Sequence, residues 1–165
     1  MVEDSMNVKL FNENKDSYKG GYENHLFEQY KIYIQSIENI SERRQSANNY
    51  FIAINTALIS ALGLSFNGDF TESIIVFRLA VAFIGMAISA IFWYLINSYK
   101  QINTGKFKVL HEIESRLPLS LYKYEWETLG HGKNNNLYYP FSHIELLLPW
   151  VLGTAYTFIV LFFLF

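Results

Sequence analysis

The chain has 165 residues, of which 51% are hydrophobic, 18% are aromatic and only 17% are charged. Soluble domains are about 25% charged, so this composition argues against an ordinary soluble enzyme and against a disordered chain. The absence of cysteine excludes disulfides and cysteine-ligated metals, and a net charge of −2 gives no global attraction to nucleic acid or anionic lipid.

The N-terminal segment differs from the rest of the chain. Residues 1–22 are rich in Asn, Lys, Glu and Gly without a sustained hydrophobic period, which predicts a disordered arm. From Glu23 onward apolar side chains recur at helical spacing, and no Pro or Gly interrupts the chain before Gly63. We therefore expect one helix to run from residue 23 into the first apolar block, within a single membrane domain of residues 23–165.

Three apolar blocks are long enough to cross the hydrocarbon core of a bilayer, which takes about 17 to 25 helical residues. They cover residues 50–66, 74–96 and 144–165. The first contains no charge, and Arg78 is the only charge inside the second. The predicted fold class is an all-α integral membrane protein with three transmembrane helices per protomer.

Basic residues predict the orientation. Arg43 and Arg44 precede the first block and Lys100, Lys106 and Lys108 follow the second, whereas the turn between these blocks has only acidic residues, Asp69 and Glu72, as its charges. The positive-inside rule therefore predicts that the N-terminus and residues 97–143 are cytoplasmic and that the C-terminus lies outside a bacterial inner membrane.

The cytoplasmic region of residues 97–143 is expected to be helical. Apolar side chains continue at helical spacing after the second block until Pro118, and a single Gly105 weakens but does not break the pattern. Ser120 is a suitable N-cap for a short helix that ends at Gly130. The two long helices should extend into the cytoplasm as an antiparallel pair.

Signatures of catalysis and metal binding are weak. The segment HEIES at residues 111–115 lacks the second His of a zinc-binding pair, and GHGK at residues 130–133 lacks the first Gly and the Ser or Thr of a phosphate loop. The sequence therefore predicts no enzyme activity, no metal site and no cofactor.

Small and polar residues recur at helical spacing in the first two blocks. Close packing of the two helices would explain them, because small side chains let helix backbones approach in lipid. The alternative is an aqueous lumen, which three helices cannot enclose, so that several copies would have to surround one axis. The candidate pore or packing residues are Thr56, Ser60, Arg78, Ala82, Gly85 and Ser89.

Arg78 has two interpretations. It lies four residues inside the second block, so its side chain can reach the outer interface and approach Asp69 or Glu72. If it instead lines a pore, a ring of Arg78 side chains would repel cations and favour anions.

Three segments carry a family resemblance: LFEQYKIYIQSIENISERRQSANNYFIAINTALISALG, WYLINSYKQINTGKFKVLHEIESRLP and YKYEWETL. They resemble the RipA family of octameric bacterial inner-membrane proteins. The resemblance implies a homo-oligomer of eight subunits. The general layout is also similar to that of SLATT-type membrane proteins, which implies a pore-forming effector in anti-phage defence.

Such an effector needs a cytoplasmic sensor. A basic collar repeated around a ring could bind a nucleotide or oligonucleotide regulator, although the same residues also serve as the positive-inside signal and contact lipid headgroups. The predicted function is a gated ion-conducting pore under the control of such a ligand, and the alternative is a non-conducting oligomeric scaffold in envelope or stress adaptation. The collar consists of Arg43, Arg44, Lys100, Lys106 and Lys108.

Overall fold

The structure, a computed structural model, describes residues 10–13, 15–67, 71–133, 137–138 and 141–164. Within these ranges all regular secondary structure is helical, which confirms the all-α prediction. The elements in chain order are α1 (Tyr22–Ser65), α2 (Glu72–Glu114), α3 (Leu121–Thr128), the 3₁₀ helix η1 (Gly130–Gly132) and α4 (Phe141–Leu164).

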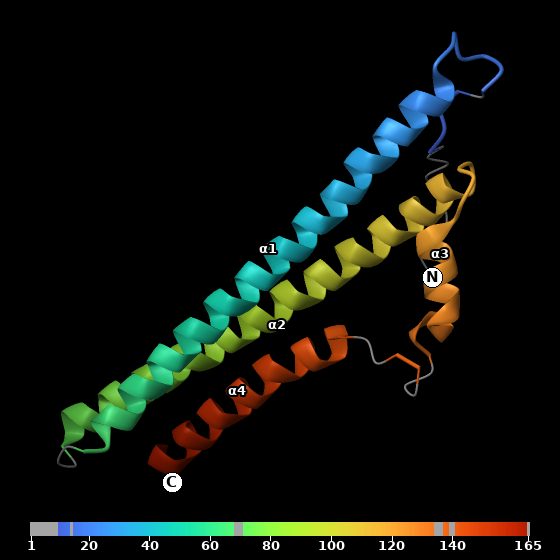
Figure 1. Cartoon of the computed structure of the whole chain (residues 1–165). Helices are drawn as coiled ribbons and strands as arrows, with labels where there is room; N and C mark the ends of the chain where they lie inside the picture. Colours follow the sequence, from blue (N-terminus) through green and yellow to red (C-terminus); the bar gives the residue numbers. More distant parts are fainter. Residues whose placement is uncertain (1–9, 14, 68–70, 134–136, 139–140, 165) are drawn as a thin grey trace.

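The two long helices form an antiparallel pair. α1 has 44 residues and α2 has 43, and they lie alongside each other for most of their length (Figure 1). The prediction of one unbroken helix through the first apolar block is therefore confirmed. Gly105 does not interrupt α2, which ends at Glu114, four residues before Pro118.

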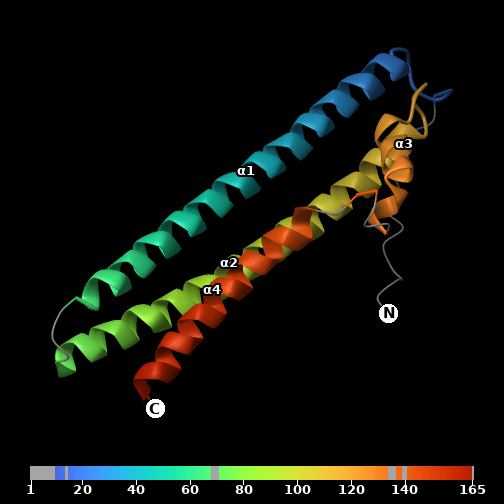
Figure 2. The same cartoon turned by 60° about the horizontal axis from the view of Figure 1, so that its bottom comes forward.

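α4 and α3 pack at opposite ends of this pair. α4 runs along the first half of α2 and ends near the turn that joins α1 to α2, whereas α3 lies beside the end of α2 (Figures 1 and 2). We call α4 and the adjacent halves of α1 and α2 the apolar region. The other halves of α1 and α2, together with α3, form the projecting region.

Clusters of buried side chains hold each region together. In the projecting region the cluster joins α1 to α2 through Leu26, Tyr30, Ile37, Leu110 and Ile113. In the apolar region one cluster joins all three helices through Leu62, Val81, Ala82, Tyr156 and Val160, and another contains Phe51, Phe92 and Ile96.

Among the described residues, two helices are long and apolar enough to cross a membrane, namely α2 and residues Ile144–Leu164 of α4. The predicted first span, residues 50–66, is not one of them, so the prediction of three such helices is corrected. Its apolar stretch is short and diluted, because Asn48 and Asn49 precede it, Asn55, Thr56 and Ser60 lie inside it, and the helix ends at Ser65.

α4 indicates the depth of the apolar region. The 21 residues Ile144–Leu164 rise by about 31 Å, close to the roughly 30 Å of a hydrocarbon core. Glu145 at the start of α4 contacts Asn48 of α1, and the ring of Phe163 at its end stacks on Phe66 with 6.0 Å between centroids. Residues 48–66 of α1 therefore lie at the same depth as α4, and the preceding half of α1 projects beyond it.

Candidate functional site

A buried hydrogen bond joins α1 to α4 at the centre of the apolar region. The hydroxyl of Tyr156 donates to Oδ1 of Asn55 at 3.1 Å, and Nδ2 of Asn55 donates to the carbonyl of Phe51 at 2.8 Å. Both Asn55 and Tyr156 are 1% exposed. The Tyr156 ring also covers Gly85 of α2, where an added Cβ would lie only 2.4 Å from the ring. Position 85 must therefore be glycine for α4 to pack here.

The predicted stripe on α2 is an internal packing surface of the protomer. Arg78, Ala82, Gly85 and Ser89 are all buried. The Ser89 hydroxyl donates to the carbonyl of Gly85 at 2.8 Å, and a Cβ at Gly153 of α4 would lie 3.8 Å from the Cβ of Ser89. The helix that covers the stripe is thus α4, whereas the sequence predicted that the first two apolar blocks would pack on each other.

Arg78 closes the end of α1. Its Nε donates to Oγ of Ser65 at 3.0 Å and its Nη2 donates to the Ser65 carbonyl at 2.6 Å. The guanidinium carbon lies 4.4 Å from the ring centroid of Phe66 and 5.3 Å from that of Phe163. Arg78 is 0% exposed in the protomer, and Asp69, one of its predicted partners, lies outside the described residues. Oxygen atoms at the end of α1 and two aromatic faces thus stabilise its charge.

The other predicted stripe, on α1, is uncovered in the protomer. The hydroxyls of Thr56 and Ser60 donate to the carbonyls four residues earlier, each at 2.8 Å, and both residues are exposed. They belong to a stripe of exposed residues with helical spacing and no large apolar side chain. This α1 polar face consists of Asn49, Ala53, Thr56, Ser60 and Gly63.

A partly buried ion pair marks the edge of the apolar region. Nη1 of Arg44 lies 3.6 Å from Oε2 of Glu145, whose side chain is well buried, and Nδ2 of Asn48 donates to the other carboxylate oxygen at 2.8 Å. Sequence reasoning missed Glu145, because one acidic residue at the start of an apolar block gives no sign of its partner.

The predicted basic collar is divided by these contacts. Arg44 is engaged by Glu145, and Nζ of Lys106 bonds to Oγ of Ser36 and lies 4.9 Å from the ring centroid of Tyr33. Lys106 therefore links α1 to α2 well beyond the level of Arg44. The remaining members are Arg43 and Lys108, which are exposed, and Lys100, which is partly buried.

A buried carboxylate attaches α3 to the long helices. Oε1 of Glu114 accepts from the Tyr30 hydroxyl and from the backbone N–H of Tyr122, and Oε2 accepts from the N–H of Lys123, all at 3.0 Å. Glu114 is 0% exposed. Burial, together with the hydrogen bond to Glu114, raises the pKa of Tyr30 to about 12. Glu114 thus caps α3, whereas the predicted cap, Ser120, makes no side-chain cap bond.

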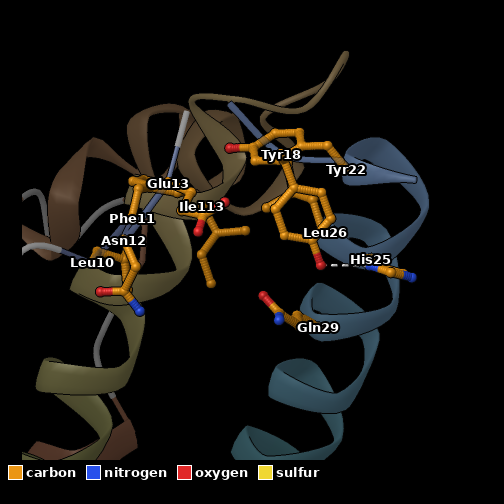
Figure 3. A pocket seen from close by; sticks show the side chains of 10 residues that line it. All are labelled: Leu10, Phe11, Asn12, Glu13, Tyr18, Tyr22, His25, Leu26, Gln29 and Ile113. Atoms are coloured by element: carbon orange, nitrogen blue, oxygen red, sulfur yellow. Dashed lines mark hydrogen bonds between the residues drawn. The ribbon is translucent and has the colours of Figure 1, made fainter. Parts of the chain in front are cut away.

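A pocket of about 290 Å³ lies where residues 10–13 cross the end of the helix pair (Figure 3). The Tyr18 hydroxyl and Nδ1 of His25 are 2.7 Å apart, and the guanidinium of Arg116 lies 3.4 Å from the ring centroid of Phe11. Within the described part of the chain, no group of three possible metal ligands is found. The residues that line the pocket include Phe11, Tyr18, Tyr22, His25, Leu26 and Gln29.

Comparison with known families gives one result. Residues 27–165, which include most of α1 and all of α2, α3 and α4, match the family described as "Octameric membrane protein family (8xMP)". No curated protein and no solved structure matches the chain. The match confirms the octameric membrane protein of the resemblance above, whereas the narrower likeness to RipA and SLATT-type proteins stays a prediction.

Proposed function

Because the chain belongs to the octameric membrane protein family, we propose that eight copies form a closed ring in a membrane and that this ring conducts ions. In this ring the α1 polar face points toward a water-filled centre. Rotation about one axis normal to the membrane lets all copies keep the same orientation and closes the assembly.

The observation that carries the proposal is a contrast between exposed faces at one depth. α2 and α4 expose large apolar side chains, which suit contact with lipid. The α1 polar face exposes amide, hydroxyl and small groups instead, which suit contact with water or with another helix. The large exposed side chains include Val76, Phe83, Ile84, Ile91, Phe158 and Phe162.

Ring geometry favours water at the centre. Even if the eight α1 helices touch, with axes about 10 Å apart, they lie on a circle of roughly 13 Å radius, and any part of α2 or α3 between them widens it. Subtracting a helix radius of about 5 Å leaves an opening no smaller than about 8 Å in radius. The short side chains of the α1 polar face cannot fill such an opening, and their polarity favours water over lipid within it.

This arrangement explains why α1 is less apolar than α2 and α4. Its second half lies at the depth of α4 through the contacts of Asn48 and Asn55. We infer that α2, α4 and neighbouring protomers shield this half of α1 from lipid, so that it needs less apolar surface than a helix surrounded by lipid. The projecting region is then cytoplasmic. Arg43 and Arg44 lie at the cytoplasmic edge of the hydrocarbon core of an inner membrane, and the C-terminus lies on the outer side.

The charges beside the ring axis favour cations. The line of the α1 polar face continues into the projecting region as Gln45, Glu42, Glu38 and Gln35, all of them exposed. Arg78 is buried, so it does not bring positive charge to the centre. Eight copies each of Glu38 and Glu42 would make the mouth negative, which attracts cations.

Ion flux through reconstituted liposomes tests the proposal. We expect the octamer to release trapped K⁺ in preference to Cl⁻, and Ser60→Phe to reduce the release because eight bulky rings would narrow the centre. Val76→Phe, at an exposed position of α2, is the matched control and should conduct like the parent protein. Liposomes that stay sealed around a verified octamer would contradict the proposal.

A non-conducting scaffold is the second candidate. The hydroxyls of Thr56 and Ser60 are already satisfied within α1, and small residues allow close helix packing, so the same face suits a dry contact between protomers. Sealed liposomes would favour this function. Control by a nucleotide and a role in anti-phage defence stay predictions from resemblance, and two of the five collar residues already have partners within the protomer.

A further inference from the structure

The outer face of α3 carries exposed apolar side chains outside the apolar region. Leu121, Tyr124 and Glu127 follow each other at intervals of three residues and therefore share one face of the helix. Tyr124 is 73% exposed and Leu121 is 60% exposed. The opposite face points inward, because the ring of Tyr122 lies 6.1 Å from that of Phe107 on α2. No lipid is expected at this height, so the outer face suits a protein partner.

A second exposed apolar residue lies at the same height on the other side of the protomer. Ile32 of α1 is 65% exposed, and it lies away from the α1 face that packs on α2 through Tyr30 and Ile37. Glu114 bonds to both Tyr30 and the start of α3, which fixes α3 at the level of Tyr30 and hence close to that of Ile32. Figure 1 shows α3 on the side of α2 away from α1.

Charged residues follow the apolar ones in the same order on both surfaces. Arg43 is exposed on α1. It lies about 16 Å nearer the apolar region than Ile32, and the helical spacing of 11 residues puts both side chains on the same side of α1. On α3, Glu127 follows Tyr124 by about 4.5 Å in the direction of α4, so Arg43 would reach it with an extended side chain directed back along α1. Within the described part of the chain, neither Arg43 nor Glu127 has an ion pair, and their charges are opposite.

We propose that α3 of each protomer packs against the Ile32 side of α1 in the next protomer, with Glu127 directed toward Arg43. A ring needs two different surfaces on opposite sides of each subunit and at one height above the membrane. The outer face of α3 and the Ile32 side of α1 meet both conditions. The inference rests on membership of the octameric family and does not depend on whether the ring conducts.

Cysteine crosslinking tests this contact directly, because the natural chain has no cysteine. Under mild oxidation, the double variant Ile32→Cys/Tyr124→Cys should give a ladder of crosslinked chains up to eight on a denaturing gel. Each single variant should stay uncrosslinked, because the contact joins two different surfaces. Ile32→Cys/Lys123→Cys is the matched control, since the Lys123 side chain points about 100° away from that of Tyr124 around α3, and it should crosslink far less.

Charge reversal provides a second, independent readout. Arg43→Glu and Glu127→Arg should each reduce the fraction of octamer measured by native mass spectrometry, and the two together should restore it. If the octamer forms but Tyr124→Cys crosslinks no better than Lys123→Cys, the proposed contact is wrong. Single charge reversals that leave the octamer unchanged would also overturn it, and the mass of the parent assembly reports separately on the eight-subunit ring.

Discussion

The apolar and projecting regions are both tied together by buried polar groups, but the chemistry of the two ties differs. At the centre of the apolar region the tie is neutral, between Asn55 and Tyr156, and a glycine lets α4 approach α2, whereas the buried charges Arg78 and Glu145 lie at its two ends. In the projecting region it is the carboxylate of Glu114, which two backbone N–H groups and a tyrosine hydroxyl satisfy. The difference agrees with the greater penalty for a charge at the centre of a lipid-facing bundle. In both regions, close side-chain packing favours association and the polar pair selects which helix faces meet.

The largest expected effect comes from enlarging the glycine under Tyr156. Gly85→Leu would place side-chain atoms where the ring now lies, and overpacking of this kind costs about 1–3 kcal/mol or more. We expect α4 to separate from α2, with a lower melting temperature in detergent and less octamer. Gly105→Leu on the same helix is the control, because no atom lies within 4 Å of its added Cβ. Equal decreases in melting temperature and octamer for the two variants would show that the close approach of Tyr156 to Gly85 is not what holds α4 on α2.

A smaller effect is expected when the carboxylate of Glu114 in the projecting region loses its charge. Glu114→Gln keeps the shape of the side chain but weakens the three hydrogen bonds, at a cost of about 1–3 kcal/mol. Faster hydrogen exchange at the amides of Tyr122 and Lys123 should report release of α3, while α4 stays protected. Glu112→Gln, at an exposed position two residues away, should leave the exchange unchanged. Slow exchange in both variants would contradict the capping role of Glu114.

Tyr156→Phe should have a milder effect, because it removes only the hydroxyl and keeps the ring over Gly85. We expect a loss of about 0.5–1.5 kcal/mol in thermal unfolding, confined to the apolar region. Tyr94→Phe is the control, since the Tyr94 side chain is exposed on α2. A loss equal to that of Gly85→Leu would mean that the hydroxyl, rather than the close approach, dominates the packing of α4.

The smallest effect concerns the pH dependence of the projecting region. An unfolded tyrosine loses its proton near pH 10, whereas folded Tyr30 keeps it until about pH 12. The contribution of Tyr30 to stability is therefore complete below pH 10 and is lost as the pH rises from 10 to 12. At pH 10.5 we expect the free energy of unfolding to have decreased by about 0.8 kcal/mol. Tyr30→Phe should remove this part of the slope in unfolding experiments, and an identical slope in both proteins would exclude Tyr30 as its source.

The sequence predicted the local features of this fold well. The absence of Pro and Gly between residues 23 and 62 predicted the unbroken α1, and the block at residues 144–165 predicted α4. The partners were harder to predict, since Asn55 and Tyr156 are 101 residues apart and Tyr30 and Glu114 are 84 apart. The small residues of α2 indicated a close approach, but they did not indicate that α4 would make it. The prediction that residues 50–66 are apolar enough to span a membrane was wrong, because this segment has no charge but contains several polar side chains that lower its hydrophobicity.

Thiol labelling of the α1 polar face tests the central claim most directly, namely that this face lines water at the depth of α4. In this experiment one residue of the α1 polar face at a time is replaced by cysteine, and liposomes containing the octamer are treated with a charged, water-soluble thiol reagent. The positions are Asn49, Ala53, Thr56, Ser60 and Gly63. We predict fast labelling at these positions and slow labelling of Phe83→Cys, whose position is exposed on α2 at the same depth. Labelling at Thr56 and Ser60 that is no faster than at Phe83 would contradict the claim.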